Sequence, residues 1–170
     1  MIHWLQKSKV ASVILLFLRL YLGFQWLMSG IGKFTKSFDA TGYLKGVIAH
    51  PVESMAGGAQ YPLYVSFLEN VVTPMGKVVN ILIPVLEVAV GLMLILGLFA
   101  SVGSLIGMTL NFLFLFAGTI SVNPLFILIS IFIFMGGYNA GVLGVDRVIG
   151  RKVDSKFMRF FNYYPDRTAV

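Results

Sequence analysis

A long apolar run near the N-terminus, from Ala11 to Phe34, constrains this chain more than any other stretch. It is long enough for a helix that crosses the hydrocarbon core of a bilayer, which takes about 20 residues. Arg19 nevertheless lies about ten residues inside it, close to mid-bilayer. A charge at that depth costs about 3 kcal/mol on insertion scales, so we expect Arg19 to have an ion-pair partner or a function.

One face of this predicted helix combines charge with small residues. Steps of four, three, four and three residues separate Arg19, Gly23, Trp26, Gly30 and Lys33, which places them in a single stripe. The stripe offers cations, an indole N–H and two glycines that let another backbone come close. We therefore expect it to face the interior of a helix bundle.

The composition places the chain among integral membrane proteins. Of its 170 residues 58% are hydrophobic and 12% are charged, whereas charged residues make up about a quarter of soluble domains. The net charge is +6, but eight of the thirteen cations flank the two ends of the chain. This distribution predicts cytoplasmic termini near anionic headgroups, with membrane lipids rather than nucleic acid as partners. The flanking cations are Lys7, Lys9, Arg147, Arg151, Lys152, Lys156, Arg159 and Arg167.

The hydropathy pattern predicts one domain over residues 1–170, an all-α integral membrane protein built as a four-transmembrane-helix bundle. An external amphipathic helix from Pro62 to Pro74 and a C-terminal interfacial helix complete it. The expected segments are spans at about 11–33, 78–99, 102–120 and 124–144, an external loop at 34–77, and a cytoplasmic amphipathic tail at 147–170.

Each span carries polar groups that lipid cannot satisfy, so these groups should converge inside the bundle. They are Arg19, Gln25, Trp26, Glu87, Asn111 and Asn139. Arg19 and Glu87 are the ionisable groups deepest in the membrane, and we expect them to pair across the interior.

Several chemistries are excluded. The chain has no cysteine, which rules out thiolate nucleophiles, iron–sulfur clusters and zinc–thiolate sites. His3 and His50 fall on opposite sides of the membrane in this topology, so no bis-histidine haem can form. No carboxylate cluster suits a metal. A flat apolar ligand with polar atoms, such as a quinone, fits what remains: Arg19, Trp26 and Asn111 could hold its carbonyls, and Glu87 could exchange its proton.

Four stretches resemble the DoxX/DoxD family of small four-span prokaryotic membrane proteins. They are RLYLGFQWLMSGIGKF, YPLYVSFLENVVTP, LEVAVGLMLILGLF and GGYNAGVLGVDR. DoxD-like members are the membrane subunit of a thiosulfate:quinone oxidoreductase. The resemblance implies a prokaryotic cell membrane protein with Arg19, Trp26, Lys33 and Glu87 at its site, with Arg19 and Glu87 in catalytic roles.

Three functions remain open. The first is a quinone-linked oxidoreductase subunit that works with a soluble partner subunit. The second is a membrane scaffold that docks a redox or oxidative-stress enzyme. The third is a small proton- or anion-coupled transporter, in which Arg19 and Glu87 form the pathway and a second copy of the chain is required.

Overall fold

The computed structural model describes residues 1–36 and 38–148, and over these residues the chain is helical, without a β-strand. The helices are α1 (Ile2–Lys7), α2 (Lys9–Thr35), α3 (Ala40–Ala49), α4 (Pro62–Phe67), the π-helix η1 (Leu68–Val72), α5 (Gly76–Leu96), α6 (Ala100–Phe116), α7 (Asn123–Gly136) and α8 (Tyr138–Gly141). The interfacial helix expected in the tail lies outside the described residues.

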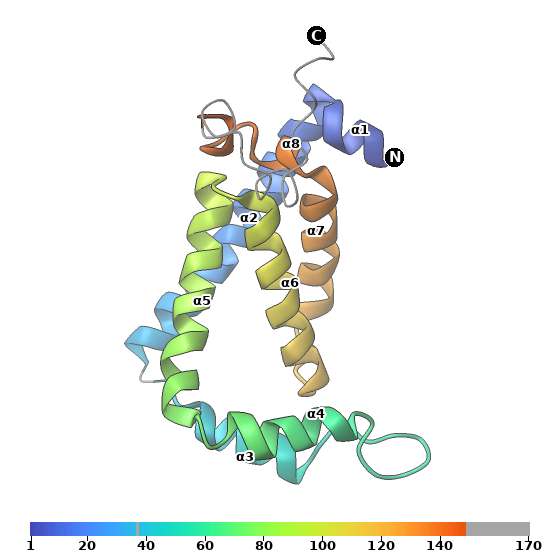
Figure 1. Cartoon of the computed structure of the whole chain (residues 1–170), viewed down its shortest axis with the longest axis vertical. Coiled ribbons are helices and arrows are strands. Elements are labelled where there is room, and N and C mark those ends of the chain that lie inside the picture. The colour runs from blue at the N-terminus through green and yellow to red at the C-terminus, as the bar shows by residue number, and fades with distance from the viewer. Residues whose placement is uncertain (37, 149–170) are drawn as a thin grey trace.

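Four helices form a bundle, and shorter helices close its two ends (Figure 1). α2, α5, α6 and α7 run along the long axis, whereas α3 and α4 lie across one end. The N-terminus, α1 and α8 lie at the opposite end. We refer to α3, α4 and η1 together as the transverse layer.

Two of the four expected spans have the length and hydropathy of a membrane helix, α2 and α5, within the described part of the chain. α6 and α7 are apolar but shorter. The prediction of one continuous helix over 124–144 is wrong, because α7 ends at Gly136. Gly137 follows with φ 54° and ψ −133°, a conformation that glycine adopts at little cost, and α8 then begins.

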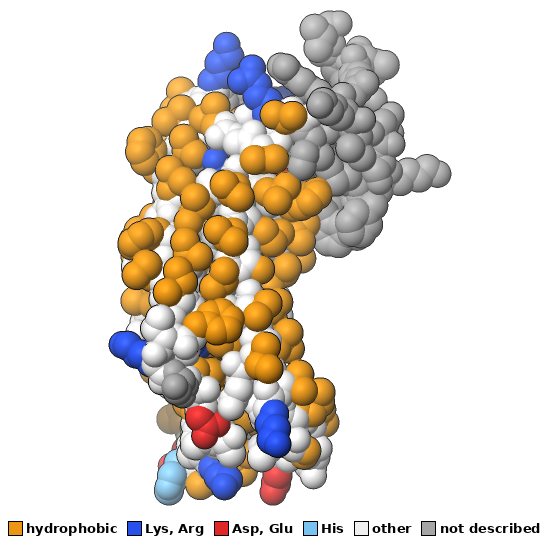
Figure 2. Space-filling model, turned by 90° about the vertical axis from the view of Figure 1, so that its left-hand side faces the viewer, with side chains coloured by type: hydrophobic (Ala, Val, Ile, Leu, Met, Phe, Trp, Pro, Cys, Tyr) orange, Lys and Arg blue, Asp and Glu red, His pale blue; other side chains and the backbone are white. Residues whose placement is uncertain are grey.

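The outer surface of the bundle is apolar, and charged groups lie inside. Figure 2 shows hydrophobic side chains covering the middle of one face, with lysine and arginine at one end and charges of both signs at the other. Phe17 and Phe24 of α2 and Ile81 of α5 are well exposed, whereas Arg19, Glu87 and Asp146 are buried. This inverted distribution is typical of a protein surrounded by lipid.

Glycines let α2 and α5 pack with their backbones in contact. A Cβ atom at Gly91 would lie 2.6 Å from the amide nitrogen of Leu27, and one at Gly30 would lie 2.9 Å from the carbonyl oxygen of Pro84. Gly23 meets Gly91 and Leu94 in the same way. The glycines of the predicted stripe on α2 therefore face α5, as small residues at a membrane helix interface do.

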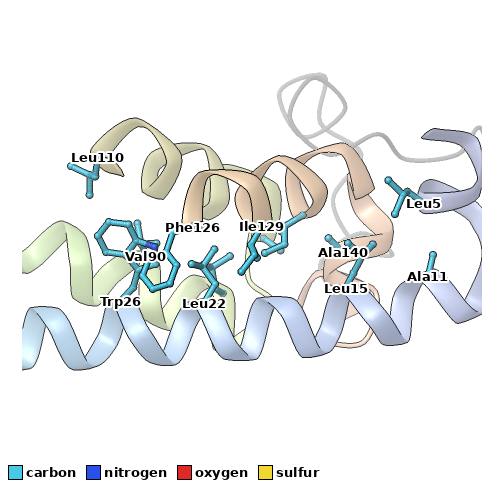
Figure 3. Packing of buried hydrophobic residues seen from close by; sticks show 13 residues of the cluster. Leu5, Ala11, Leu15, Leu22, Trp26, Val90, Leu110, Phe126, Ile129 and Ala140 are labelled. Atoms are coloured by element: carbon cyan, nitrogen blue, oxygen red, sulfur yellow. The ribbon is translucent and has the colours of Figure 1, made fainter. Parts of the chain in front are cut away.

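The core continues along the bundle from this seam (Figure 3). Trp26 and Leu22 of α2 pack with Val90 of α5 and with Phe126 and Ile129 of α7. Further toward the α1 end, Leu15 packs beside Ala140 of α8. One apolar core thus joins α2, α5 and α7.

Side-chain hydrogen bonds fix the transverse layer to the bundle. Asn80 of α5 accepts a hydrogen bond from the backbone N–H of Ala40 at 2.8 Å. The hydroxyl of Tyr64 in α4 donates to the carbonyl of Leu113 in α6 at 2.8 Å. α3 is thereby held against α5, and α4 against α6.

The segment expected to form one amphipathic helix from Pro62 to Pro74 folds as α4 and η1, and its apolar side chains do not share one buried face. Leu68 is buried, whereas Val71 and Met75 are 46% and 49% exposed. η1 has the wider turn of a π-helix, so residues at α-helical spacing no longer share one face there. α3 was not expected, since its glycines suggested a broken loop.

Candidate ligand-binding site

Glu87 pairs with Lys33 and not with Arg19. The Lys33 amine donates hydrogen bonds to both Glu87 carboxylate oxygens at 2.8 Å. The predicted pairing of Arg19 with Glu87 is therefore wrong, and the register of the α2–α5 seam explains why. Gly30 lies against Pro84 and Val88, which puts Glu87 at the Lys33 end of α2, about 21 Å of helical rise from Arg19.

Arg19 belongs to a different cluster, at the α1 end of the bundle. Its guanidinium donates to the carbonyl of Leu143 at 3.1 Å and lies against Gly97 and Gly144, where any side chain would collide with it. The nearby carboxylate of Asp146 accepts hydrogen bonds from the N–H groups of Phe99 and Ala100, at 2.7 and 3.1 Å. Arg19 thus helps to join α2 to the α5–α6 turn and to the loop after α8.

Five of the predicted site residues line one pocket of about 460 Å³, which we call the polar pocket. They are Gln25, Trp26, Lys33, Glu87 and Asn111. Phe114 and Phe126 add apolar walls, and Thr119 and Ser121 lie at the end near the transverse layer. Polar groups from α2, α5 and α6 therefore meet in one concave site.

Two polar side chains in this pocket lack partners. Trp26 is 3% exposed and Asn111 is 1% exposed. Within the part of the chain that the structure describes, neither the indole N–H of Trp26 nor the amide nitrogen and oxygen of Asn111 forms a hydrogen bond. Buried polar groups are nearly always paired, and leaving one unpaired costs about 1–3 kcal/mol. The pair therefore offers donors and an acceptor to a bound molecule.

Asn139, also predicted as a ligand-binding residue, lies elsewhere, and its side-chain nitrogen is bonded within the protein. Its side-chain amide donates to the carbonyls of Leu5 and Ser8, at 2.7 and 3.0 Å. It thus holds the junction of α1 and α2 against α8.

A second pocket, of about 270 Å³, lies between the transverse layer and the bundle, and we call it the apolar pocket. Its lining includes Leu44, Phe67, Leu68, Val72, Val79, Ile83, Leu113 and Ala117. Lys33, Phe114 and Thr119 line both pockets, so the two are adjacent. None of these apolar residues was predicted as a site residue, because an apolar side chain in an apolar chain carries no distinctive sequence signal.

Electrostatics at the transverse layer follow from its hydrogen bonds and burial. The Asp39 carboxylate accepts a hydrogen bond from the Thr41 backbone N–H at 2.9 Å, and this bond lowers the pKa of Asp39 below its usual value. Burial of the Tyr64 phenol raises its pKa to about 12. Tyr64 therefore remains a neutral hydrogen-bond donor at physiological pH.

A family model, DoxX, matches residues 14–120 of the chain. The chain belongs to the DoxX family. The same comparisons gave no match to a curated protein or to a solved structure.

Membership agrees with the apolar helices in making this DoxX protein a membrane protein. The matched range runs from α2 through the end of α6 and contains every predicted residue that lines the polar pocket. Asn139 and Asp146 lie beyond it. The part matched by the family model therefore supplies the lining of the apolar pocket and most of the lining of the polar pocket, to which Ser121 and Phe126 are added from beyond the match.

Proposed function

We propose that this DoxX protein binds the head group of a lipoquinone in the polar pocket and acts as the quinone-linked membrane subunit of an oxidoreductase. The observation that carries the proposal is the buried, unpartnered pair of Trp26 and Asn111 beside an ion pair. A quinone ring is flat and apolar and carries two carbonyl acceptors, so its chemistry complements these donors.

The polar groups fit both redox forms of such a ligand. Trp26 can only donate a hydrogen bond, which suits a carbonyl oxygen. Asn111 offers both a donor and an acceptor, so its amide can hold either a carbonyl or a hydroxyl. The two aromatic walls, Phe114 and Phe126, suit the faces of the ring.

The Lys33–Glu87 pair supports proton exchange at the same place. A bound quinone supplies a two-electron, two-proton couple. Glu87 is 1% exposed, whereas Lys33 is 25% exposed, so the pair extends from the pocket interior toward the surface. The Lys33 ammonium can give a proton to Glu87 for delivery to a reduced quinone and then take up another from the surface, and the reverse order of transfers serves oxidation of the quinol.

The topology in this proposal follows the flanking cations. The termini are cytoplasmic, the bundle spans the membrane four times, and the transverse layer lies on the outer side, where both pockets are located. Electrons come from a donor held by a soluble partner subunit.

The test uses the fluorescence of Trp26. The chain has two tryptophans, so Trp4→Phe leaves Trp26 as the only tryptophan, and excitation at the red edge of the tryptophan band avoids the tyrosines. A quinone in the polar pocket should quench this emission saturably, and quinone should be found by mass spectrometry after gentle purification. Asn111→Ala should weaken binding by about tenfold, the effect of one hydrogen bond in a buried site.

Asn70→Ala is the matched control, because Asn70 is exposed in η1 and bonds only to Ser66. It should bind quinone like the parent. Absence of both saturable quenching and co-purified quinone would refute the proposal. Co-purification of a protein partner without any ligand would favour the scaffold hypothesis instead.

A further inference from the structure

We propose that the apolar pocket holds the isoprenoid chain of the same quinone, so that the chain lies beneath the transverse layer rather than in the lipid between the helices. This inference rests on the proposed function and extends it to the place that the chain of the ligand occupies. It requires a quinone that carries a prenyl chain.

The first argument is continuity between the two pockets. Lys33, Phe114 and Thr119 line both. A ligand whose ring contacts Trp26 and Asn111 therefore has an adjoining space for its substituent. That space leads toward α3 and α4, away from the buried cluster at Arg19.

The second argument is that the apolar pocket offers no free hydroxyl among the residues the structure describes. The Tyr64 hydroxyl donates to Leu113 at 2.8 Å. The Tyr43 and Thr119 hydroxyls are bonded to each other at 2.7 Å. Each of these hydroxyls already has a hydrogen-bond partner within the protein, and the rest of the lining is predominantly apolar, so the space suits a hydrocarbon chain better than a polar group.

The third argument is the incomplete burial of the apolar side chains around the pocket. Val72, Val79 and Ile83 are only half-buried, although they lie between the transverse layer and the bundle. Burying their remaining apolar surface against a chain is favourable. Because Asn80 and Tyr64 tie the layer to α5 and α6, the pocket is held in place before the chain arrives.

An acyl chain of a phospholipid has the same chemistry. We assign the pocket to the prenyl chain because the unpartnered Trp26 and Asn111 lie in the adjoining pocket and suit a quinone ring. A phosphate group would need a free cation, and the cation that lines the polar pocket, Lys33, is already paired with Glu87.

The test compares two quinones with the same ring, one bare and one with a short prenyl chain, by Trp26 quenching in the Trp4→Phe background. The parent should bind the prenylated quinone at least about tenfold more tightly than the bare one, the effect of burying about two CH₂ groups. Val79→Phe fills the apolar pocket and should abolish this preference, leaving the affinity for the bare quinone unchanged.

Val78→Phe is the matched control, because Val78 neighbours Val79 on α5 but is 50% exposed on the outer surface. Val78→Phe should keep the preference of the parent for the prenylated quinone. Because its outer surface also meets detergent, it controls for partition of the ligand into the micelle. Ala117→Leu fills the pocket from α6 and should repeat the result if Val79→Phe does not fold.

Each other outcome overturns the inference in a recognisable way. If both pocket-filling variants keep the preference, or lose affinity for both quinones equally, the chain does not lie there, although binding of the bare quinone would still support the proposed function. If the parent binds neither quinone, the proposed function fails first. If purified parent holds a phospholipid that Val79→Phe releases and shows no prenyl preference, the pocket takes an acyl chain.

Discussion

The amine of Lys33 lies 2.8 Å from each carboxylate oxygen of Glu87 and 3.0 Å from the hydroxyl of Ser29. The same amine lies 5.5 Å from the centre of the Phe38 ring. Lys33 therefore joins the end of α2, the middle of α5 and the start of the transverse layer. It is the one residue of the predicted charge stripe that reaches both pockets.

The ion pair predicts energetic coupling between Lys33 and Glu87. Removing one partner of a buried pair costs about 3–5 kcal/mol. We expect the lower value for Glu87→Leu, because the Lys33 side chain that it leaves unpaired is 25% exposed, whereas Lys33→Leu leaves a carboxylate that is 1% exposed. The double variant should recover part of that loss in thermal unfolding in detergent. The changes in unfolding free energy caused by Arg19→Leu and Glu87→Leu should instead be additive to within about 0.5 kcal/mol, because the two residues are far apart. Coupling between Arg19 and Glu87 would contradict the register of α2 and α5.

The hydrogen bonds that Asp146 accepts predict a large loss of stability when its carboxylate is removed. Asp146→Ala leaves the buried N–H groups of Phe99 and Ala100 without an acceptor, which should cost about 2–3 kcal/mol of unfolding free energy. Asp39→Ala is the control, because Asp39 accepts from Thr41 at an exposed helix start and should cost less. Similar melting temperatures for the two variants would argue against a structural role for Asp146.

The α2–α5 seam predicts that two glycine substitutions have opposite effects. Gly91→Ala places a methyl group against the backbone of Leu27 and should destabilise the protein by about 1–3 kcal/mol. Gly32→Ala meets no atom within 4 Å and should be neutral or stabilising by up to about 1 kcal/mol, since alanine favours a helix. Chemical denaturation in mixed micelles can measure both.

Tyr64 predicts a loss of stability at alkaline pH. Folding raises its pKa to about 12, above the ordinary value of about 10. The stabilisation from the neutral phenol is complete below pH ~10 and is lost as the pH rises toward ~12. Absorbance titration should show one late-ionising tyrosine, which Tyr64→Phe removes, whereas Tyr61→Phe should leave it in place.

Membrane topology can be tested with reporter fusions. A fusion after Met75 should report from the outer side, and one at Val170 from the cytoplasm, because basic residues flank the termini. An outer signal from Val170 would reverse the bundle and place the pockets on the cytoplasmic side.

The sequence was informative where one periodic rule governed position. The spacing of Gly23, Trp26 and Gly30 correctly put these residues on the face of α2 that contacts α5. Expecting polar residues of apolar helices to converge led to the group around Glu87 and Asn111, which the structure places in one pocket.

The sequence was uninformative where position depended on register and on breaks in the helices. The predicted pairing of Arg19 with Glu87 assumed that the depth of each residue within its span decides which residues meet. A shift of α5 along α2 by one helical turn, however, changes which residues face each other. Because the chain breaks at Gly137, Asp146 lies at the turn beside Phe99. The prediction of a continuous fourth helix gave no reason to expect that contact. The apolar pocket depends on α3, in which Gly42 and Gly46 favour a loop, although Asp39 and Pro51 mark its two ends.

The backbone contact between α2 and α5 has a consequence for insertions and deletions. One added residue turns everything beyond it by about 100° around a helix, which would move Gly23 or Gly30 off the contact and bring a larger side chain onto it. We therefore expect functional variants to keep the same number of residues from Gly23 to Gly30 and from Pro84 to Gly91. The loop at residues 50–61, which joins α3 to α4 at the surface, should accept added or deleted residues freely.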